Sequence, residues 1–287
     1  MPLDRAVVVD KWMRLSAAPR CALLLRELGN CFRLVVMPQL FSSELDDLAR
    51  RFPDHAIGGR QDYARHYIDM SGSFDDYMAQ FSGKTRSTLR RKQRKLAEEC
   101  GGAYELREYR TPGEVARFLE QALPLSAMTY QARLLDAGLP ETPEAHAELF
   151  ALAERDRLRC YLLEKGDEAL AYLALPVESA TLVYAWLGYR PEWARLSPGT
   201  VLQMEALERL FAEDRYRWFD FTEGEGAHKA MFGTGSIDCA SFLLLRKTLA
   251  NRALMGARGG FDAAIVGAKA IAARTGAEAL LRKALRA

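Results

Sequence analysis

The sequence predicts a mixed α/β fold, in which helices pack on a sheet that has strands of both directions. From residue 103 onward, strand-like runs and amphipathic stretches follow one another in the order βααβββαβαβ, and short turns join the three consecutive strands in the middle. The chain has 287 residues, of which 49% are hydrophobic and 27% are charged, so it can bury a large core.

The first hundred residues have shorter and more mixed patterns. Ser73 is a candidate N-cap for a short helix, because its hydroxyl can accept a hydrogen bond from a free amide of the first turn. After the break at Ser82-Gly83, a strongly basic helix is expected at 85–99, ending at Gly101-Gly102. The other predicted elements here are strands at 31–37 and 66–70 and helices at 43–52 and 73–81.

The elements after residue 103 have clearer boundaries. Pro112 and Pro143 stand in the first turn of two predicted helices, where the missing N–H of proline is not needed. Lys165-Gly166-Asp167 and Glu178-Ser179 are typical of hairpin turns, and apolar residues recur at helical spacing in 198–212. The predicted strands are 103–109, 159–164, 169–177, 181–188, 216–221 and 238–245, and the predicted helices are 112–122, 142–155, 198–212 and 227–232.

These patterns divide the chain into four expected segments. They are an N-terminal subdomain at 1–81, a basic connecting helix at 82–102, a main domain at 103–246 and a C-terminal tail at 247–287. The tail is rich in Ala, Arg, Lys and Gly, and its apolar residues recur as they do on one face of a basic amphipathic helix.

The composition excludes several classes of protein. Lys and Arg number 40 and Asp and Glu 38, so any basic surface must be local. The five cysteines are scattered and have no CxxC spacing, which argues against a disulfide framework or a zinc site and favours the reducing cytoplasm. We also expect neither a signal peptide nor a membrane-spanning segment, because charges interrupt every apolar run.

One candidate binding site is the turn Ser197-Pro198-Gly199-Thr200, which follows a predicted strand and opens a predicted helix. The amides of a helix N-terminus attract anions, so Gly199, Thr200 and Val201 could hold a phosphate, with Arg195 adding positive charge. The same residues also fit an ordinary helix start, with Ser197 as N-cap and Pro198 as the first helical residue.

A second candidate site follows the next strand, where Glu223, Glu225, His228 and Lys229 occur in a glycine-rich loop. A carboxylate or an imidazole can accept a proton, so Glu223, Glu225 and His228 are candidate general bases. Lys229 could stabilise a developing oxyanion or bind an anionic group. The alternative is a solvated loop whose acids favour the N-terminus of the next helix.

The basic helix is a third candidate site. Its cations repel one another, so an anionic partner is expected to offset them, unless they simply form a solvated face. The candidate partners are coenzyme A phosphates, an acidic carrier protein, RNA and lipid headgroups, and the lack of interleaved aromatic residues weakens the nucleic-acid alternative. The cations are Lys84, Arg86, Arg90, Arg91, Lys92, Arg94 and Lys95.

The remaining histidines and cysteines carry no sign of chemistry. His55, His66 and His146 lack the spacing of metal ligands, so we expect no metal site. Cys160 and Cys239 lie in apolar strand patterns, which favours a place in the core over a covalent acyl-cysteine.

Several of these motifs together resemble the GNAT acyltransferase superfamily, and more closely its CelD/BioF2-like branch, which is related to the Fem-type aminoacyltransferases. The resemblance covers about 82–245 and implies that residues 1–80 form a shortened, degenerate first GNAT-like half. The sequence departs from the usual RxxGxG cofactor motif, because Ser197-Pro198-Gly199 replaces the glycine pair after Arg195. The matching motifs are Lys84-Thr85-Arg86, Leu89-Arg90-Arg91, Ser197-Pro198-Gly199-Thr200, Phe219-Asp220-Phe221, Gly224, His228-Lys229 and Phe232-Gly233.

The resemblance implies roles for particular residues. An acyl-coenzyme A, or alternatively an acyl carrier protein, would supply the acyl group, and Tyr184 and Trp186 would line its pantetheine arm. Tyr130 and Arg133 lie where such enzymes build the acceptor pocket, and Lys84, Arg86 and Arg90 would bind an anion.

The sequence therefore predicts an N-acyltransferase that moves an acyl group, long-chain by expectation, from a thioester to an amine. A lipid amine such as a sphingoid base, acylated at the inner face of the cytoplasmic membrane as by a bacterial ceramide synthase, fits the basic segments. Two alternatives stay open. One is a Fem-type transferase that uses aminoacyl-tRNA, and the other is a non-catalytic accessory protein of envelope polysaccharide synthesis.

Overall fold

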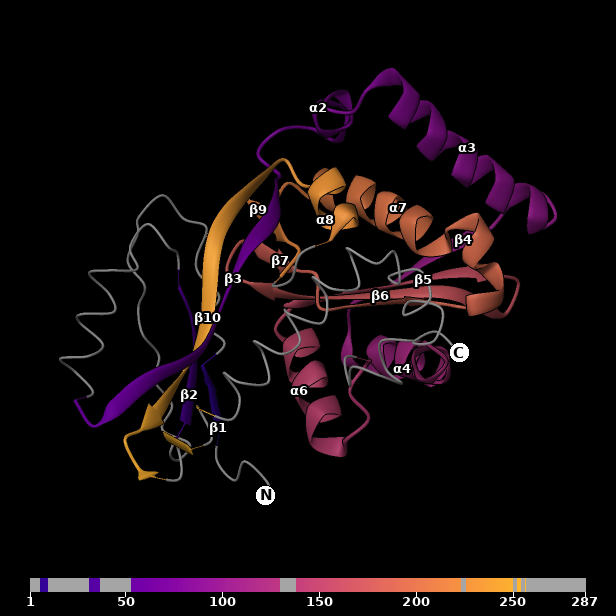
Figure 1. Cartoon of the computed structure of the whole chain (residues 1–287). Helices are drawn as coiled ribbons and strands as arrows, with labels where there is room; N and C mark the ends of the chain where they lie inside the picture. The colour runs from indigo at the N-terminus through magenta and orange to yellow at the C-terminus, as the bar shows by residue number, and fades with distance from the viewer. Residues whose placement is uncertain are drawn as a thin grey trace, which may run out of the picture. The chain divides into compact units, whose positions relative to one another are not determined.

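The computed structural model describes residues 6–9, 31–36, 53–129, 138–222, 226–249, 252, 253 and 256, with the backbone alone at 6–9, 31–36, 55–62 and 238–246. The chain forms two compact units (Figure 1). One contains 1–63 and 238–287, and the other contains 64–237. Residues 64–81, which the sequence analysis places in an N-terminal subdomain, lie in the second unit.

The described part of the first unit consists mainly of strands. β1 (Ala6–Val9) pairs in parallel with β2 (Cys31–Val36), and β10 (Gly235–Arg246) pairs antiparallel to β2. The strand predicted at 31–37 is therefore confirmed, whereas the helix predicted at 43–52 and most of the tail lie outside the described residues. β3 (His55–Asp69) begins in this unit and continues into the second, so it is much longer than the strand predicted at 66–70.

The second unit has a mixed sheet, as the sequence predicts. Its strands follow the order β3-β9-β7-β6-β5-β4, and β8 pairs with β6 beside this path. Among these strands, β7 and β9 pair in parallel, and the neighbours β3 and β9, β7 and β6, β6 and β5, β5 and β4, and β6 and β8 pair antiparallel. The strands are β4 (Glu105–Tyr109), β5 (Leu158–Lys165), β6 (Glu168–Glu178), β7 (Thr181–Val183), β8 (Trp186–Tyr189) and β9 (Trp218–Asp220).

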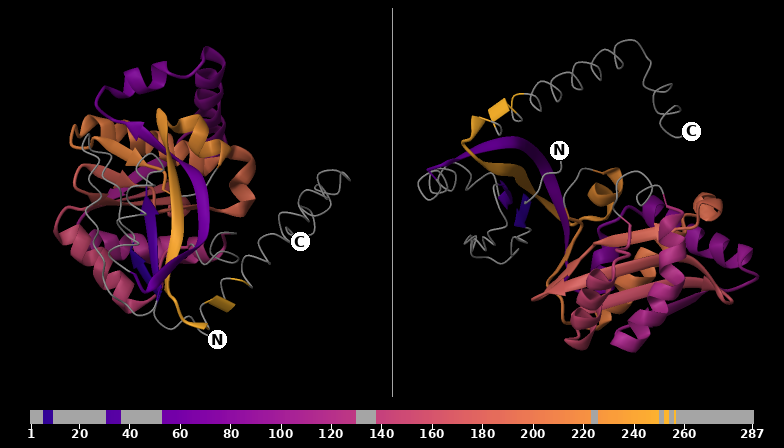
Figure 2. Two further views of the ribbon diagram at one scale, coloured as in Figure 1. Left: turned by 60° about the vertical axis from the view of Figure 1, so that its left-hand side comes forward. Right: turned by 90° about the horizontal axis from the view of Figure 1, so that it is seen from below.

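Helices cover both faces of this sheet (Figures 1 and 2). On one face lie α4 (Pro112–Ala127) and α6 (Pro143–Glu154), and α7 (Pro198–Ala212) lies on the other. Beside α7 are α2 (Phe74–Ala79), α3 (Gly83–Glu99) and α8 (Ala227–Phe232), and the 3-10 helix η2 (Pro191–Leu196) precedes it. The bounds of α7 and α8 are those predicted, whereas α4 continues five residues beyond the expected end at 122, through Pro124.

Local capping fixes where several of these helices begin. The hydroxyls of Ser73 and Thr111 accept hydrogen bonds from the amides of Asp76 and Glu114, whose carboxylates bond back to the capping residues. These reciprocal capping boxes satisfy amides that the helix itself leaves free. Ser82 caps α3 in the simpler way, through the amide of Thr85.

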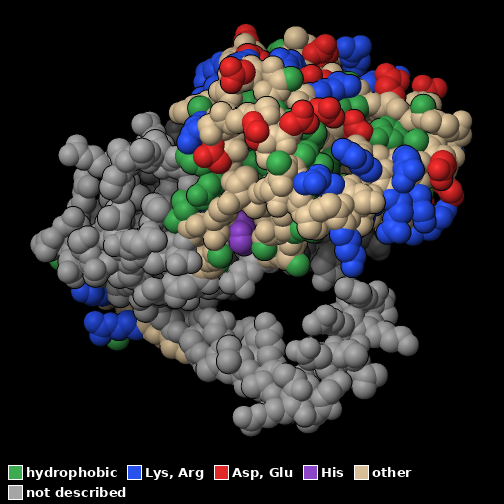
Figure 3. Space-filling view, turned by 90° about the horizontal axis from the view of Figure 1, so that it is seen from above, with side chains coloured by type: hydrophobic (Ala, Val, Ile, Leu, Met, Phe, Trp, Pro, Cys, Tyr) green, Lys and Arg blue, Asp and Glu red, His purple; other side chains and the backbone are tan. Residues whose placement is uncertain are grey.

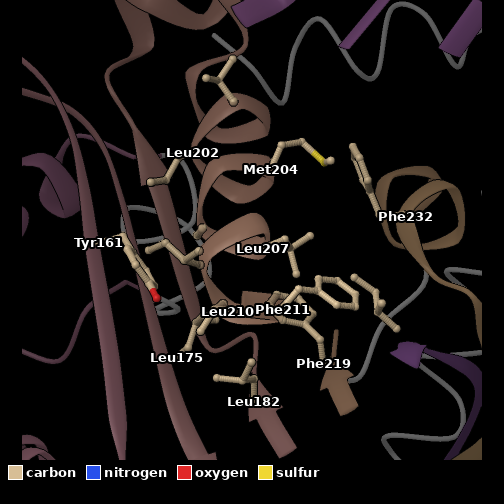
Figure 4. Packing of buried hydrophobic residues seen from close by; sticks show 14 of the residues in the cluster. Tyr161, Leu175, Leu182, Leu202, Met204, Leu207, Leu210, Phe211, Phe219 and Phe232 are labelled. Atoms are coloured by element: carbon tan, nitrogen blue, oxygen red, sulfur yellow. The ribbon is translucent and has the colours of Figure 1, made fainter. Parts of the chain in front are cut away.

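The core of the second unit consists of two clusters, one on each face of the sheet. The larger cluster lies around α7, and Figure 4 shows Tyr161 and Leu175 of the sheet on one side of this helix and Phe232 of α8 on the other. Leu202 and Leu207 of α7 are fully buried, and burying a leucine side chain stabilises the fold by about 1.5–3 kcal/mol. The smaller cluster lies under α4 and α6.

The strand predicted at 181–188 is interrupted, which corrects the sequence prediction. β6 pairs Val177 with Leu182 and Ala174 with Trp186, so β6 advances three residues while the facing chain advances four. The extra residue is a β-bulge, which bends a strand and changes its direction. The break separates β7 from β8, and the amide of Ala185 bonds to the carbonyl of Val183 at 2.8 Å within it.

A buried ion pair joins β3 to the end of β9. Nε of Arg65 donates to Oδ1 of Asp220 at 2.9 Å, and Nη2 donates to Oδ2 at 2.5 Å. The two side chains are only 8% and 2% exposed. Asp220 Oδ1 also accepts a hydrogen bond from the amide of Thr222 at 2.9 Å. The carboxylate therefore holds both the neighbouring strand and the first residues after β9.

Because this ion pair is buried, we expect Asp220→Ala to lower the free energy of unfolding by about 3–5 kcal/mol, since the Arg65 guanidinium would lose this carboxylate while it stays away from water. Glu105→Ala is the matched control. It removes a carboxylate from an exposed ion pair with Arg107, so we expect little change. Urea unfolding followed by circular dichroism measures both. Equal effects of the two substitutions would show that the buried pair does not stabilise this part of the fold.

Candidate functional site

The N-terminus of α7 has an unusual backbone. Ser197, the N-cap, has a left-handed conformation with φ of 56°, and its side chain makes no capping hydrogen bond. Its carbonyl accepts hydrogen bonds from the amides of both Thr200, at 3.0 Å, and Val201, at 3.2 Å. Pro198 has no N–H, so Gly199 supplies the one first-turn amide without a backbone partner among the described residues. The hydroxyl of its neighbour Thr200 likewise has no hydrogen-bond partner in the described ranges.

Close packing explains the glycine in this turn. A Cβ at position 199 would lie 2.9 Å from Cδ2 of Leu187 and 3.1 Å from Cδ1 of Tyr189, both from β8. The helix N-terminus therefore rests directly on β8, and the ring of Tyr189 is 39% exposed beside it. Among the predicted site residues, the structure brings Ser197, Gly199, Thr200 and Val201 together at this place.

Arg195 lies in the last turn of η2, just before the start of α7, and its guanidinium forms an ion pair with Glu99 at the end of α3. Both side chains are largely exposed. Lys165 Nζ lies 3.5 Å from the carbonyl oxygen of Glu99 and 5.3 Å from the ring centroid of Trp193 in η2. The C-terminal end of α3 is thus fixed beside the turn that precedes α7.

The strands on either side of the turn separate at the β-bulge. β7 and β9 pair in parallel up to Val183 and Asp220, and the amide of Tyr184 makes a last bond to the Asp220 carbonyl at 2.9 Å. Beyond this point β8 stays with β6, whereas the amide of Phe221 bonds to the carbonyl of His66 in β3 at 3.1 Å. The two segments therefore pair with different strands. The segment that contains β8 leads to α7, and the segment after β9 leads to α8.

Tyr184 lies at the point of separation. Its ring centroid is 5.4 Å from that of Phe221 and 6.5 Å from that of His228, and burial raises the pKa of its hydroxyl. Trp186, which is predicted to line the pantetheine arm together with Tyr184, packs instead against the smaller hydrophobic cluster under α4 and α6. The structure therefore does not bring Trp186 and Tyr184 together.

On α8, His228 is held by a partner that the sequence analysis does not predict. Its Nε2 lies 2.7 Å from Oε1 of Gln203 in α7. Gln203 is fully buried, and its Nε2 has no hydrogen-bond partner among the described residues. The two positions are 25 residues apart, and a glutamine on an apolar helix face was the one local sign that could have revealed the pair.

The surroundings of His228 keep its imidazole neutral. Burial, together with the positive charges of Lys92 and Lys229, lowers its pKa to about 4. Lys92 belongs to α3, and burial also lowers the pKa of its own ammonium group. A neutral ring whose Nε2–H points to the Gln203 oxygen has its acceptor lone pair on Nδ1.

Four predicted site residues lie outside the described residues: Glu223, Glu225, Tyr130 and Arg133. Shortly before Tyr130 and Arg133 in the sequence, Ser126 and Thr129 are buried, and the Tyr172 hydroxyl donates a hydrogen bond to Ser126 Oγ at 3.0 Å.

In the described ranges, no three His, Cys, Asp or Glu side chains gather as metal ligands would. No helix of the described part is long and apolar enough to cross a bilayer.

Of the residues expected to bind anions, Arg86 donates to the carbonyl oxygens of Phe81 at 2.7 Å and Ala79 at 3.4 Å. It therefore closes the end of α2 locally. Lys84 and Arg90 are exposed on α3.

Several solved structures are similar to this chain. The C-terminal domain of a protein described as a lysylphosphatidylglycerol synthetase from Agrobacterium fabrum has 14% identity and a TM-score of 0.50, over 78% of this chain and 70% of that chain. FemX has 12% identity and a TM-score of 0.49, over 74% and 72%. A tandem GNAT protein from the clavulanic acid biosynthesis pathway has 15% identity and a TM-score of 0.42, over 76% and 64%.

A search of curated protein sequences gives no significant match. The model of a protein family, described as an acetyltransferase (GNAT) domain, matches residues 83–230, which is more than half of the chain. This range includes α3, the bulged strand, the turn before α7 and His228. The chain therefore belongs to the GNAT acetyltransferase family.

Proposed function

We propose that this protein is an N-acyltransferase that moves an acyl group directly from a thioester to an amine. The observation that carries the proposal is the separation of β7–β8 from β9 at Val183 and Asp220, between the start of α7 and the start of α8. Separated strands leave backbone groups that can bond to the amides of a pantetheine arm. Within the family, we propose the CelD/BioF2-like, Fem-related branch for this chain.

The donor is proposed to be an acyl-pantetheine thioester, carried either by coenzyme A or by an acyl carrier protein. Its phosphate would bind at the start of α7, where the Gly199 amide and the Thr200 hydroxyl are the available donors. The pantetheine arm would then lie along Tyr184, whose half-buried ring has its centroid 6.5 Å from that of His228.

The proposed reaction forms one bond and breaks another. The neutral amine nitrogen attacks the thioester carbonyl carbon, the C–N bond forms, and the C–S bond breaks as the sulfur leaves as a thiolate. The nitrogen loses a proton to a base, and the thiolate takes up a proton to become the free thiol. The sum is an amide and a thiol, with no oxidation or reduction.

His228 is one candidate for that base. It is neutral at physiological pH, and its Nδ1 is the free acceptor if Nε2–H stays bonded to Gln203. Its low pKa makes it a weak base, however, because proton transfer is most effective when the pKa of the base is near the working pH. Glu223 and Glu225 therefore remain candidates from the sequence, and Lys229 would stabilise the oxyanion or an anionic acceptor.

The acceptor is proposed to be a lipid-like amine, such as a sphingoid base, and the acyl chain to be long. Tyr184 beside His228 is half-buried, and Met231, on the same helix as His228, is 44% exposed, so apolar side chains reach the surface here. Such a surface favours apolar chains over sugars or charged peptides. The basic tail predicted at 247–287 supports work at an anionic membrane surface.

The proposal predicts that purified protein releases free thiol from a long-chain acyl-coenzyme A only when an amine is present. A thiol-reactive dye would follow the release, and mass spectrometry would identify the amide. The amine panel should include a sphingoid base, an amino acid and a polyamine. If no amine gave an amide, while aminoacyl-tRNA served as donor, the Fem-type alternative would replace the proposal; inactivity with every donor would favour an accessory protein.

Thr200→Val links that activity to the start of α7. The substitution removes one hydroxyl and keeps the shape of the side chain, so we expect the KM for the donor to rise on the order of tenfold, as loss of one hydrogen bond to a charged group does. Thr200→Ser keeps the hydroxyl and should stay near the wild-type value. An unchanged KM in Thr200→Val would place the donor phosphate elsewhere.

The pKa of His228 also predicts how stability depends on pH. Its folded value of about 4 lies below its ordinary value of 6.5, so between these values the unfolded chain binds a proton that the folded chain does not. The stability that this neutral ring supplies is therefore complete above pH 6.5 and is lost as the pH falls toward 4. Urea unfolding at several pH values should show a steeper loss for the wild type than for His228→Gln. Parallel curves would contradict a depressed pKa.

A further inference from the structure

α3 carries a row of cations that the fold itself does not use. Helical spacing places Lys84, Arg91, Arg94 and Lys95, here called the basic stripe, on the side of α3 opposite the buried Leu89 and Leu96. All four side chains are exposed. Figure 3, which views the molecule from above Figure 1, shows Lys and Arg groups interspersed with Asp and Glu.

None of the four forms an ion pair with a residue that the structure describes, although such pairs are frequent elsewhere in this unit. Like charges repel along a helix, so the stripe lowers the stability of α3 unless something anionic binds to it. Arg86 and Lys92 differ from the stripe, because one closes the end of α2 and the other is partly buried toward His228.

α3 is fixed alongside the donor helix. Gln93 donates to Glu205 of α7 at 3.1 Å, and Glu99 at the end of α3 pairs with Arg195 just before the start of α7. The hydroxyl of Tyr104 donates to the same Glu205 carboxylate at 2.5 Å. Lys95, the last residue of the basic stripe, is one helical turn before Glu99, so the stripe ends near the turn that precedes α7, where the proposed function puts the phosphate of the donor.

We propose that the basic stripe docks an acidic acyl carrier protein, which delivers the acyl group as a pantetheine thioester. This inference rests on the proposed function and names the form of its donor. The start of α7 supports it, because Pro198 has no N–H and the amides of Thr200 and Val201 are bonded to Ser197. The Gly199 amide and the Thr200 hydroxyl match the single phosphodiester of a carrier-bound pantetheine better than the pyrophosphate and additional phosphate of coenzyme A.

A protein carrier fits this face better than a membrane or a nucleic acid. A helix that binds a bilayer normally inserts apolar side chains, but the exposed large hydrophobic residues of the described part are Met128, Tyr189, Met231 and Leu249, none of them in α3. α3 also has no aromatic side chain on which a base could stack. Acidic helices of a carrier protein need only complementary charge.

The transfer balances as it does with any thioester. The acyl carbon leaves the sulfur of the carrier's pantetheine and joins the amine nitrogen, the sulfur takes up a proton, and the carrier is released with its free thiol. Docking at the basic stripe contributes to binding only, so charge reversal there should raise KM and leave kcat unchanged.

Steady-state kinetics with two donors tests this proposal. Palmitoyl-coenzyme A and a palmitoylated acyl carrier protein would be compared in the wild type, in R91E/R94E, and in the control R117E/R155E. The control makes the same change of net charge at exposed residues of α4 and at the end of α6, on the opposite face of the sheet.

In R91E/R94E we expect the KM for the carrier protein to rise about tenfold and the KM for palmitoyl-coenzyme A to change less than about twofold. The control should match the wild type with both donors. If R91E/R94E raised neither KM, or raised both KM values equally, the stripe would not recognise a carrier and the proposal would be overturned.

Direct binding separates this inference from the proposed function. If neither donor reacted with any amine, the proposed function would fail. Fluorescence anisotropy of a labelled holo-acyl carrier protein would still show whether the carrier binds to the basic stripe. Binding that weakens in R91E/R94E and at higher salt supports the stripe as a docking surface. No binding to the carrier, or binding of tRNA or anionic vesicles that the same reversal abolishes, overturns it.

Discussion

One extra residue between Leu182 and Trp186 separates the strands around which the candidate site is built. Without the bulge, β7 and β8 would form one strand that could pair with the chain of β9 along its whole length. With it, pairing ends at Val183 and Asp220, and the two chains diverge. The ion pair of Asp220 with Arg65 holds the end of β9 on the β3 side of this divergence. The end of the β7–β9 pairing and the buried ion pair of Asp220 thus both fix where the chain after β9 turns away from β8.

The electrostatics of the site follow from how α3, α7 and α8 pack. Burial and two neighbouring cations keep His228 neutral, and Gln203 fixes which nitrogen faces the helix. A neutral imidazole can accept a proton, whereas a protonated one cannot. The basic stripe differs from this interior arrangement because its charges stay in water, where they act on the rate and affinity of an encounter.

The sequence predicted the elements whose boundaries depend on local chemistry. α7 and α8 begin and end where Pro198 and the flanking glycines predict, and Ser73 caps α2 as expected. The bulge was not predictable, because residues 181–188 contain no glycine or proline before Gly188 and look like one continuous apolar strand. The pairs Gln203–His228 and Arg65–Asp220 were also missed, since partners 25 and 155 residues apart are joined by the fold alone.

The most direct measurement is a crystal structure with a non-hydrolysable thioether analogue of a long-chain acyl-pantetheine phosphate. The account predicts that the arm lies between β8 and the chain after Asp220, with its phosphate at the Gly199 amide and its sulfur near Tyr184. Binding at another place, or strands that close against each other in the complex, would contradict the central claim that this divergence forms the donor site.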